Sequence, residues 1–457
     1  MRSTFLHTSI SHRIAPGAKA LAANQVPVRG LLMSLALWLM IWGGYNTGIQ
    51  RLFGPNFPAN ALDLFHGIRA LLPFMAAWLA LIMLLVRRSL PVRLFQGPLG
   101  MLALYNLVGI ASSIVLSPDP LMAIYWAAQY SSVIIVFWAI LANSNPLPHL
   151  SRLIVLNWTI IAVLTTGLMA FFLIQPGVIS ILGGGDFLGT ARPYDGLAGI
   201  PVEKEMLGMM GTRSTGLGRY AGVAALIALA RLWQGAKWFR SIWVLLFLFF
   251  LSVLIFSQAR TAVLAFLIGA LLILWLQSRS KILLILGVSI ALFLLGLIGF
   301  YQASWIYLTL GTEEVVDIFL SRRAVTWQET WQLFLTSPLL GCGFYADRLF
   351  EIRGQHTHNA FLHALLQTGL MGTIPFVLAF AGAWIILFRL LKRPSILRPE
   401  KSLLVEIAGA LAYLTVRTIA ESTGAFYGSE LFLLTPLFAY ITILNQRKSS
   451  LNQITFK

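Results

Sequence analysis

Residues 241–277 read SIWVLLFLFFLSVLIFSQARTAVLAFLIGALLILWLQ, and this stretch decides the fold class. Two apolar runs, 241–257 and 261–277, flank a short polar turn that holds a single charge, Arg260. Each run is close to the length of about 20 residues with which a helix crosses a bilayer. The stretch therefore predicts two membrane-spanning helices joined by a turn.

Similar apolar runs recur along the 457-residue chain, of which 58% is hydrophobic and 11% is charged. This composition is more apolar than one soluble core requires. The sequence therefore predicts an all-α polytopic membrane protein with about twelve transmembrane helices. The expected spans are 31–50, 66–86, 97–116, 121–142, 153–174, 217–232, 241–257, 261–277, 282–301, 359–388, 403–418 and 430–445. The span 359–388 is too long for one straight crossing, so we expect its first part to line a substrate cavity.

The positions of the basic residues predict the orientation. The formal net charge is +17, and Lys and Arg concentrate in every second connection, as in Arg87, Arg88 and Arg93. By the positive-inside rule these connections are cytoplasmic, which places both termini in the cytoplasm. The first 30 residues lack the pattern of a cleavable signal, so we expect the first span to act as an uncleaved anchor.

This orientation divides the chain into alternating membrane regions and long outer loops. Two connections, 175–216 and 302–358, are predicted to be periplasmic, and loops of this length are uncommon unless they are functional or disordered. The second is predicted to contain an amphipathic helix over 321–336, with Ala324, Trp327, Trp331, Phe334 and Leu335 on one stripe. That stripe indicates either packing on the bundle or contact with the membrane surface. The predicted divisions are 1–30 (cytoplasmic segment), 31–174 (five helices), 175–216 (loop), 217–301 (four helices), 302–358 (loop), 359–445 (three helices) and 446–457 (cytoplasmic tail).

The predicted outer side carries cations against the positive-inside bias, and nearly all are arginines. Arginine binds phosphate oxygens with a planar fork of donors, so this composition favours a diphosphate ligand. Pairing with nearby acids is the competing interpretation for each arginine. Arg260 is the hardest to explain in that way, because no acid lies within 50 residues of it in the sequence. Arg213 and Arg219 flank a glycine-containing turn before an apolar helix, where backbone donors can also hold an anion.

A histidine pair opens the apolar helix after the second loop, in the sequence Gln355-His356-Thr357-His358-Asn359. Histidine can take a proton from a hydroxyl near neutral pH, because its unperturbed pKa is about 6.5. A metal site is the alternative, but the sequence offers no convincing third ligand. These parts together favour transfer of a group from a lipid diphosphate to a hydroxyl, without cofactor or metal.

Several ordered motifs resemble the conserved domain of O-antigen ligases and polymerases. They are Arg213-Ser214-Thr215-Gly216, Ser257-Gln258-Ala259-Arg260-Thr261-Ala262, Arg323 with Trp327, Ser337-Pro338-Leu339-Leu340-Gly341-Cys342-Gly343-Phe344, His358-Asn359-Ala360-Phe361-Leu362 and Gln367-Thr368-Gly369-Leu370-Met371-Gly372. The resemblance covers roughly 210 to 372 and implies a GT-C-like membrane enzyme of the bacterial inner membrane. It departs from the family pattern at Gly218-Arg219-Tyr220-Ala221, where many members have proline and asparagine.

The resemblance also implies the substrates and the roles of the site residues. The donor would be a glycan on undecaprenyl diphosphate, with no nucleotide and no obligatory metal. His358 would be the general base, and Arg213 and Arg260 would hold the diphosphate. Substrate binding would also involve Arg322, Arg323, Arg219 and Asn359.

The identity of the acceptor separates several functions with the same chemistry. The leading interpretation is an O-antigen ligase of lipopolysaccharide biosynthesis that joins the glycan to lipid A-core. A polymerase would use a second lipid-linked glycan, and a protein O-oligosaccharyltransferase would use a serine or threonine of a protein such as pilin. A transporter or flippase is the alternative from another class, but its charges would line a path near the membrane midplane.

Overall fold

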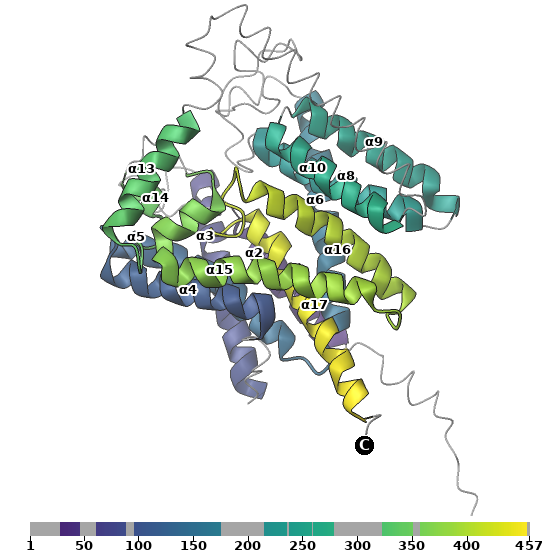
Figure 1. Cartoon of the computed structure of the whole chain (residues 1–457), viewed down its shortest axis with the longest axis horizontal. Helices are drawn as coiled ribbons and strands as arrows, with labels where there is room; N and C mark the ends of the chain where they lie inside the picture. Colours follow the sequence, from purple (N-terminus) through teal and green to yellow (C-terminus); the bar gives the residue numbers. More distant parts are fainter. Residues whose placement is uncertain are drawn as a thin grey trace, which may run out of the picture.

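The computed structural model describes residues 28–45, 61–87, 96–174, 214–234, 237–257, 259–277, 322–350 and 357–454. Within these ranges every regular element is a helix (Figure 1). The elements are α2 (Val28–Gly43), α3 (Ala61–Arg87), α4 (Gly97–Val115), α5 (Pro120–Leu141), α6 (Pro146–Ile174), α8 (Ser214–Gln234), η3 (Lys237–Phe239), α9 (Arg240–Phe256), α10 (Arg260–Gln277), α13 (Arg322–Thr336), α14 (Ala346–Leu349), α15 (Ala360–Lys392), α16 (Arg398–Arg417) and α17 (Ser429–Ile454).

The chain is a multi-pass membrane protein. Five of the described helices contain candidate spans that are long and apolar enough to cross a bilayer: Gly67–Val86, Gly97–Val115, Pro120–Leu141, Pro146–Ala170 and Ala360–Lys392. The shorter helices α2, α9 and α10 are also apolar. Helices α8, α16 and α17 lie outside this set. A total of about twelve spans remains a prediction, as do the two periplasmic loops.

The predicted spans coincide with helices wherever the structure describes the chain, and 282–301 lies outside the described residues. Three helix ends differ most from the predicted spans. Helix α2 ends at Gly43 rather than at 50, because Gly44 and Tyr45 form a turn. Helix α6 begins at Pro146 rather than at 153, since proline fits the first turn of a helix. Helix α17 continues to Ile454 rather than ending at 445, because hydropathy marks the apolar part of a helix and not its end.

The helices pack as one bundle with α17 near its centre, in contact with α4, α5, α6, α15 and α16. Figure 1 shows α4 beside α15, and α8, α9 and α10 grouped next to α16. Close packing in that group depends on small residues. A Cβ atom on Gly269 would lie 2.9 Å from the carbonyl oxygen of Gly409, so α10 and α16 meet nearly backbone to backbone.

A buried amide joins three helices at the middle of the bundle. The indole nitrogens of Trp38 and Trp42 donate to Asn157 Oδ1 at 2.7 and 3.0 Å. Asn157 Nδ2 donates to the carbonyl oxygen of Phe432 at 2.9 Å. Pro436, four residues further along α17, has no N–H with which to bond this carbonyl. Asn157 therefore supplies the donor that the proline removes, and it ties α2 and α6 to α17.

Helix α15 is interrupted at Gly369, whose φ of 57° and ψ of −160° are not helical. Before the break, the carbonyls of Leu366 and Gln367 accept hydrogen bonds from the amides of Cys342 and Gly343, at 2.7 and 3.0 Å. After the break, the amides of Leu370 and Met371 donate to the carbonyls of Pro338 and Leu339, at 2.9 and 3.1 Å. The loop 337–343 thus completes the backbone bonding of the broken helix. The span is therefore not one straight helix, and a substrate cavity lined by its first part stays a prediction.

The predicted amphipathic helix is confirmed as α13, but its apolar residues do not share one environment. Phe334 is buried, whereas the side chains of Trp331 and Leu335 are 44% and 50% exposed. The indole of Trp327 donates to the carbonyl oxygen of Thr357 at 2.8 Å. The helix therefore both packs on the protein and presents apolar surface, and it contacts the segment that contains His358.

Candidate functional site

One end of the bundle gathers the residues singled out from the sequence. Here α8, α10, α15 and α17 begin and α16 ends, and we call this the site end. A Cβ atom on Gly218 in α8 would lie 2.6 Å from Ala259, directly before α10. Tyr413 of α16 donates to the carbonyl oxygen of Gly218 at 3.2 Å. The amide of Ala360, the first residue of α15, donates to the carbonyl oxygen of Thr418 at 2.8 Å. Helices distant in the sequence therefore meet here.

His358 has a left-handed backbone conformation, with a φ of 46°. This backbone conformation is unfavourable for most residues other than glycine. Such strain often occurs at functional positions. Residues on both sides maintain it. Thr357 is fully buried and contacts Thr330 and Trp327 of α13. Asn359 accepts hydrogen bonds from the amides of Phe361 and Leu362, which caps α15.

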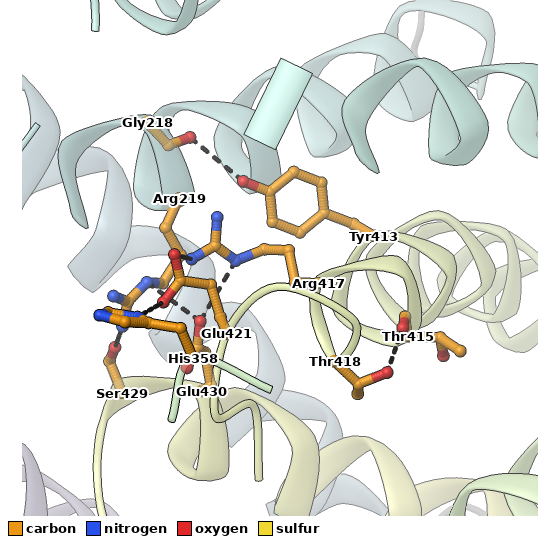
Figure 2. A network of polar contacts seen from close by, with 10 residues as sticks. All are labelled: Gly218, Arg219, His358, Tyr413, Thr415, Arg417, Thr418, Glu421, Ser429 and Glu430. Carbon is orange, nitrogen blue, oxygen red and sulfur yellow. Dashed lines mark hydrogen bonds and ion pairs between the residues drawn. The ribbon is translucent and has the colours of Figure 1, made fainter. Parts of the chain in front are cut away.

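The side chain of His358 enters a network of acids and arginines from three helices and one loop (Figure 2). His358 Nδ1 lies 3.3 Å from Glu421 Oε2, in the loop between α16 and α17. The other oxygen of Glu421 lies 3.9 Å from Arg417 Nη2. Glu430 Oε1 lies 3.2 Å from the Nε atoms of both Arg417 and Arg219. The network therefore extends from His358 through two carboxylates to two arginines.

The charges in this network determine the protonation state of Glu421. Burial alone would raise the pKa of Glu421, but the hydrogen bond with His358 and the positive charges of Arg417 and Arg219 lower its pKa to about 2. Glu421 is consequently a carboxylate throughout the neutral range. A fixed negative charge beside the Nδ1 atom of His358 favours the tautomer with its proton on that nitrogen.

Substituting Glu421 with glutamine is expected to lower the free energy of unfolding by about 3 kcal/mol, because Arg417 and Arg219 lose a buried counter-charge. The pKa of Glu421 in the folded protein lies below its ordinary value of 4.5. Its stabilising effect is therefore present above the ordinary value and is lost only as the pH falls towards about 2. Thermal unfolding in detergent should show a deficit for E421Q relative to wild type that persists from about pH 8 down to about pH 5, because Glu421 is ionised throughout this range.

The matched control is E400Q, because Glu400 pairs with Arg447, whose side chain is 52% exposed, at the other end of the bundle. This pair is expected to contribute less than about 1 kcal/mol. A deficit for E421Q that disappears between pH 8 and pH 5 would contradict the assignment of Glu421 as a permanently ionised residue.

The predicted site residues differ in how much of each the structure describes. His358, Asn359 and Arg219 are described with their side chains, and all three lie at the site end. Arg219 donates to Ser429 at 2.6 Å and pairs with Glu430, and Asn359 Nδ2 donates to the carbonyl oxygen of Ile419 at 3.0 Å. For Arg260, Arg322 and Arg323 the structure describes only the backbone, with Arg260 first in α10 and Arg322 first in α13. Arg213 and His356 lie outside the described residues.

Two acids of the network, Glu421 and Glu430, were missed in the sequence analysis. Both lie in the sequence between the apolar spans of α16 and α17, on the predicted outer side. The sequence feature that marks them is the same as for Arg260. An ionisable group between apolar spans costs free energy unless it has a partner. Applying that argument to acids as well as to cations would have identified them.

Arg69 of α3 has a structural role at the end of α2. Its Nε atom donates to the carbonyl oxygen of Gly43 at 3.0 Å, and its Nη2 atom donates to that of Tyr45 at 2.5 Å. These carbonyls belong to the end of α2 and the turn after it, where helical partners are missing. For this residue, local bonding explains the charge.

Comparison with protein families gives one result. Residues 245–377 match the family model described as O-antigen ligase. A search of curated proteins found no match. The matched segment includes α10, α13, α14 and the first part of α15, together with His358 and the loop that enters the break in α15. Residues 245–377 of this chain thus form a domain of the O-antigen ligase family.

Proposed function

We propose that this protein transfers a glycan from undecaprenyl diphosphate to an acceptor hydroxyl, at the non-cytoplasmic face of the bacterial inner membrane. The O-antigen ligase domain supports the reaction class. The observation that carries the proposal is the contact at the site end of His358 Nδ1 with the ionised Glu421, at 3.3 Å. His358 lies within the matched domain, and Glu421 follows that domain in the sequence. We propose lipid A-core as the acceptor.

The first step is removal of the acceptor's proton. With Nδ1–H donating to Glu421, the Nε2 atom of His358 is the basic nitrogen of the ring. It accepts the hydroxyl proton as the acceptor oxygen attacks. The positive charge that develops on the imidazole is stabilised by the carboxylate of Glu421, which remains ionised.

The second part of the reaction breaks the bond between the sugar and the diphosphate. The acceptor oxygen forms a bond to the anomeric carbon, and the bonding pair of the broken bond leaves with the diphosphate oxygen. Arg213, Arg260, Arg322 and Arg323 are proposed to bind this diphosphate and stabilise the charge that it gains. A single displacement requires no nucleophilic side chain.

Two residues predicted to bind substrate are assigned supporting roles in this proposal. Asn359 uses its side chain to cap α15 and to bond the carbonyl oxygen of Ile419. Arg219 pairs with Glu430 and donates to Ser429. We propose that both residues position the loop that contains Glu421, rather than contacting the donor directly.

The deciding experiment offers one lipid-linked donor to the purified protein with three rival acceptors. These are lipid A-core, a second lipid-linked glycan and a pilin, each in the presence of a chelator. Product on lipid A-core supports the ligase, product on the second glycan a polymerase, and product on pilin a protein oligosaccharyltransferase. Transport of the donor across vesicles without any product would contradict glycan transfer, and loss of activity in chelator would contradict metal independence.

Substituting Arg260 with lysine is expected to weaken donor binding about tenfold, because lysine keeps the charge but loses the planar fork of donors. The measurement is the KM for the lipid-linked donor in reconstituted vesicles. The matched control is R240K, since Arg240 begins α9 at the opposite end of the bundle from Arg260. An unchanged KM in R260K would argue against bidentate binding of the diphosphate.

A further inference from the structure

Glu430 lies one step further from His358 than Glu421, and it contacts two arginines with the same oxygen. We infer that Glu430 is a positioning residue for the proposed reaction. By binding Arg417, it keeps Arg417 from forming a hydrogen bond with Glu421, and Glu421 therefore stays in contact with His358. This inference rests on the proposed function for its effect on turnover. Figure 2 shows Glu430 with Arg219, Arg417, Glu421 and His358.

Arg417 is the residue for which the two acids compete. Its side chain is 1% exposed, and its Nε atom donates to Glu430 at 3.2 Å. Its Nη2 atom is buried and has no hydrogen-bond partner within the described residues. Glu421 Oε1 lies 3.9 Å from Nη2, which is too long for a hydrogen bond. A buried guanidinium with an unsatisfied donor gains free energy from any carboxylate that approaches it.

The geometry shows what would follow if Glu430 lost its charge. Glu421 lies one helical turn beyond Arg417 and is the other carboxylate that contacts it. A movement of about 1 Å would bring Glu421 within hydrogen-bond distance of Nη2. The second oxygen of Glu421, now 3.3 Å from His358, would be drawn away from the imidazole. The left-handed backbone of His358 is held by Thr357 and Asn359, so the histidine could not follow easily.

A second buried pair shows that this arrangement is not general in the protein. Glu406 accepts from Arg231 with both carboxylate oxygens, at 2.9 and 3.3 Å, and also accepts from Trp158. The carboxylate of Glu406 thus pairs with one arginine, whereas that of Glu430 contacts both Arg219 and Arg417. Glu406 lies eleven residues before Arg417 in α16, or about 16 Å along the helix. The substitution E406Q is therefore a matched control that removes a buried acid remote from His358.

The experiment compares E430Q with wild type and with E406Q in two measurements. In the first, E430Q is expected to lower the kcat of glycan transfer on the order of 10- to 100-fold per folded protein. The KM for the donor is expected to stay within about threefold, because no proposed donor contact is removed. E406Q is expected to keep both constants near those of wild type.

The second measurement is nuclear magnetic resonance, which reports the tautomer of His358 without any reaction. In protein with nitrogen-labelled histidine, the neutral His358 ring is expected to give the signals of an Nδ1-protonated tautomer hydrogen-bonded to a carboxylate. The signals are assigned by their loss in H358N. E430Q should lose this signature and E406Q should keep it.

A double substitution keeps the inference testable if E430Q folds poorly. In R417M/E430Q no charge of residue 417 competes for Glu421, and replacing a buried charged pair is often tolerated. This variant is expected to regain the His358 signature and part of the lost kcat. Wild-type kcat and signature in E430Q, or equal losses in E406Q, would overturn the inference. If the signature changes as expected but no acceptor receives glycan, the proposed function fails and the positioning role of Glu430 stands.

Discussion

Substituting His358 with asparagine is expected to lower glycan transfer by about 10²- to 10⁴-fold while the protein still folds and inserts. Asparagine tolerates the left-handed backbone better than most residues, which suits the φ of 46° at this position. Its amide can also donate to Glu421, as Nδ1 does in wild type. It has no basic atom corresponding to Nε2, so the proposed proton acceptor alone is removed.

The measurement is single-turnover transfer with purified, reconstituted protein and saturating donor and acceptor. H358A is expected to lose as much activity and to be less stable, because alanine gains neither the contact with Glu421 nor tolerance of the backbone conformation. The control H149N replaces a buried histidine of α6 that contacts Ser34, remote from the site end. H358N with wild-type turnover would refute the role of His358 as general base.

The membrane architecture was largely predictable because apolar runs determine where helices cross a bilayer. The spans 97–116, 121–142 and 261–277 agree with α4, α5 and α10 to within one residue at each end. Boundaries failed where a helix continues into polar sequence, as α17 does beyond residue 445. Length and hydropathy indicate whether a helix lies in lipid or in water. The residue at which a helix ends depends instead on local caps and turns.

The candidate site was predictable only in part, since its charges are paired across the fold. His358 was identified from its chemistry, but its partner Glu421 is 63 residues away in the sequence. Glu430 contacts Arg219 across 211 residues, the difference between those two positions. No spacing rule connects such residues, because the contact arises only when α8, α16 and α17 pack together. The arginines predicted as ligands could not be separated from paired arginines for the same reason.

The motifs that carried the family resemblance have two different physical roles. His358 lies in the polar network, whereas Ser337-Pro338-Leu339-Leu340-Gly341-Cys342-Gly343-Phe344 and Gln367-Thr368-Gly369 form the joint in α15. Gly341 and Gly343 form a tight turn on either side of Cys342, with φ values of 71° and 88°. These glycines belong to the joint that shapes the helix beginning after His358, and their effect on the reaction is indirect.

The joint leads to the largest expected effect on stability. Substituting Gly369 with alanine is expected to destabilise the protein by about 3 kcal/mol or more, since two costs add. The φ of 57° is unfavourable for alanine, and its Cβ atom would lie 2.3 Å from the carbonyl carbon and oxygen of Leu339. Both obstacles are backbone atoms, and the hydrogen bonds from Leu370 and Met371 hold them in place. Thermal unfolding in detergent, read with the yield of monodisperse protein, measures the loss.

The matched control is G167A in α6, where an added Cβ atom would meet nothing within 4 Å. Alanine is favoured over glycine inside a helix by up to about 1 kcal/mol, so G167A should be neutral or stabilising. G369A is expected to fold too poorly for turnover to be interpreted, and G341A should resemble it, because its Cβ atom would lie 2.5 Å from the amide of Thr368. Wild-type stability in G369A would show that the loop 337–343 can separate from α15, and the backbone bonds across the break would then contribute little to the fold.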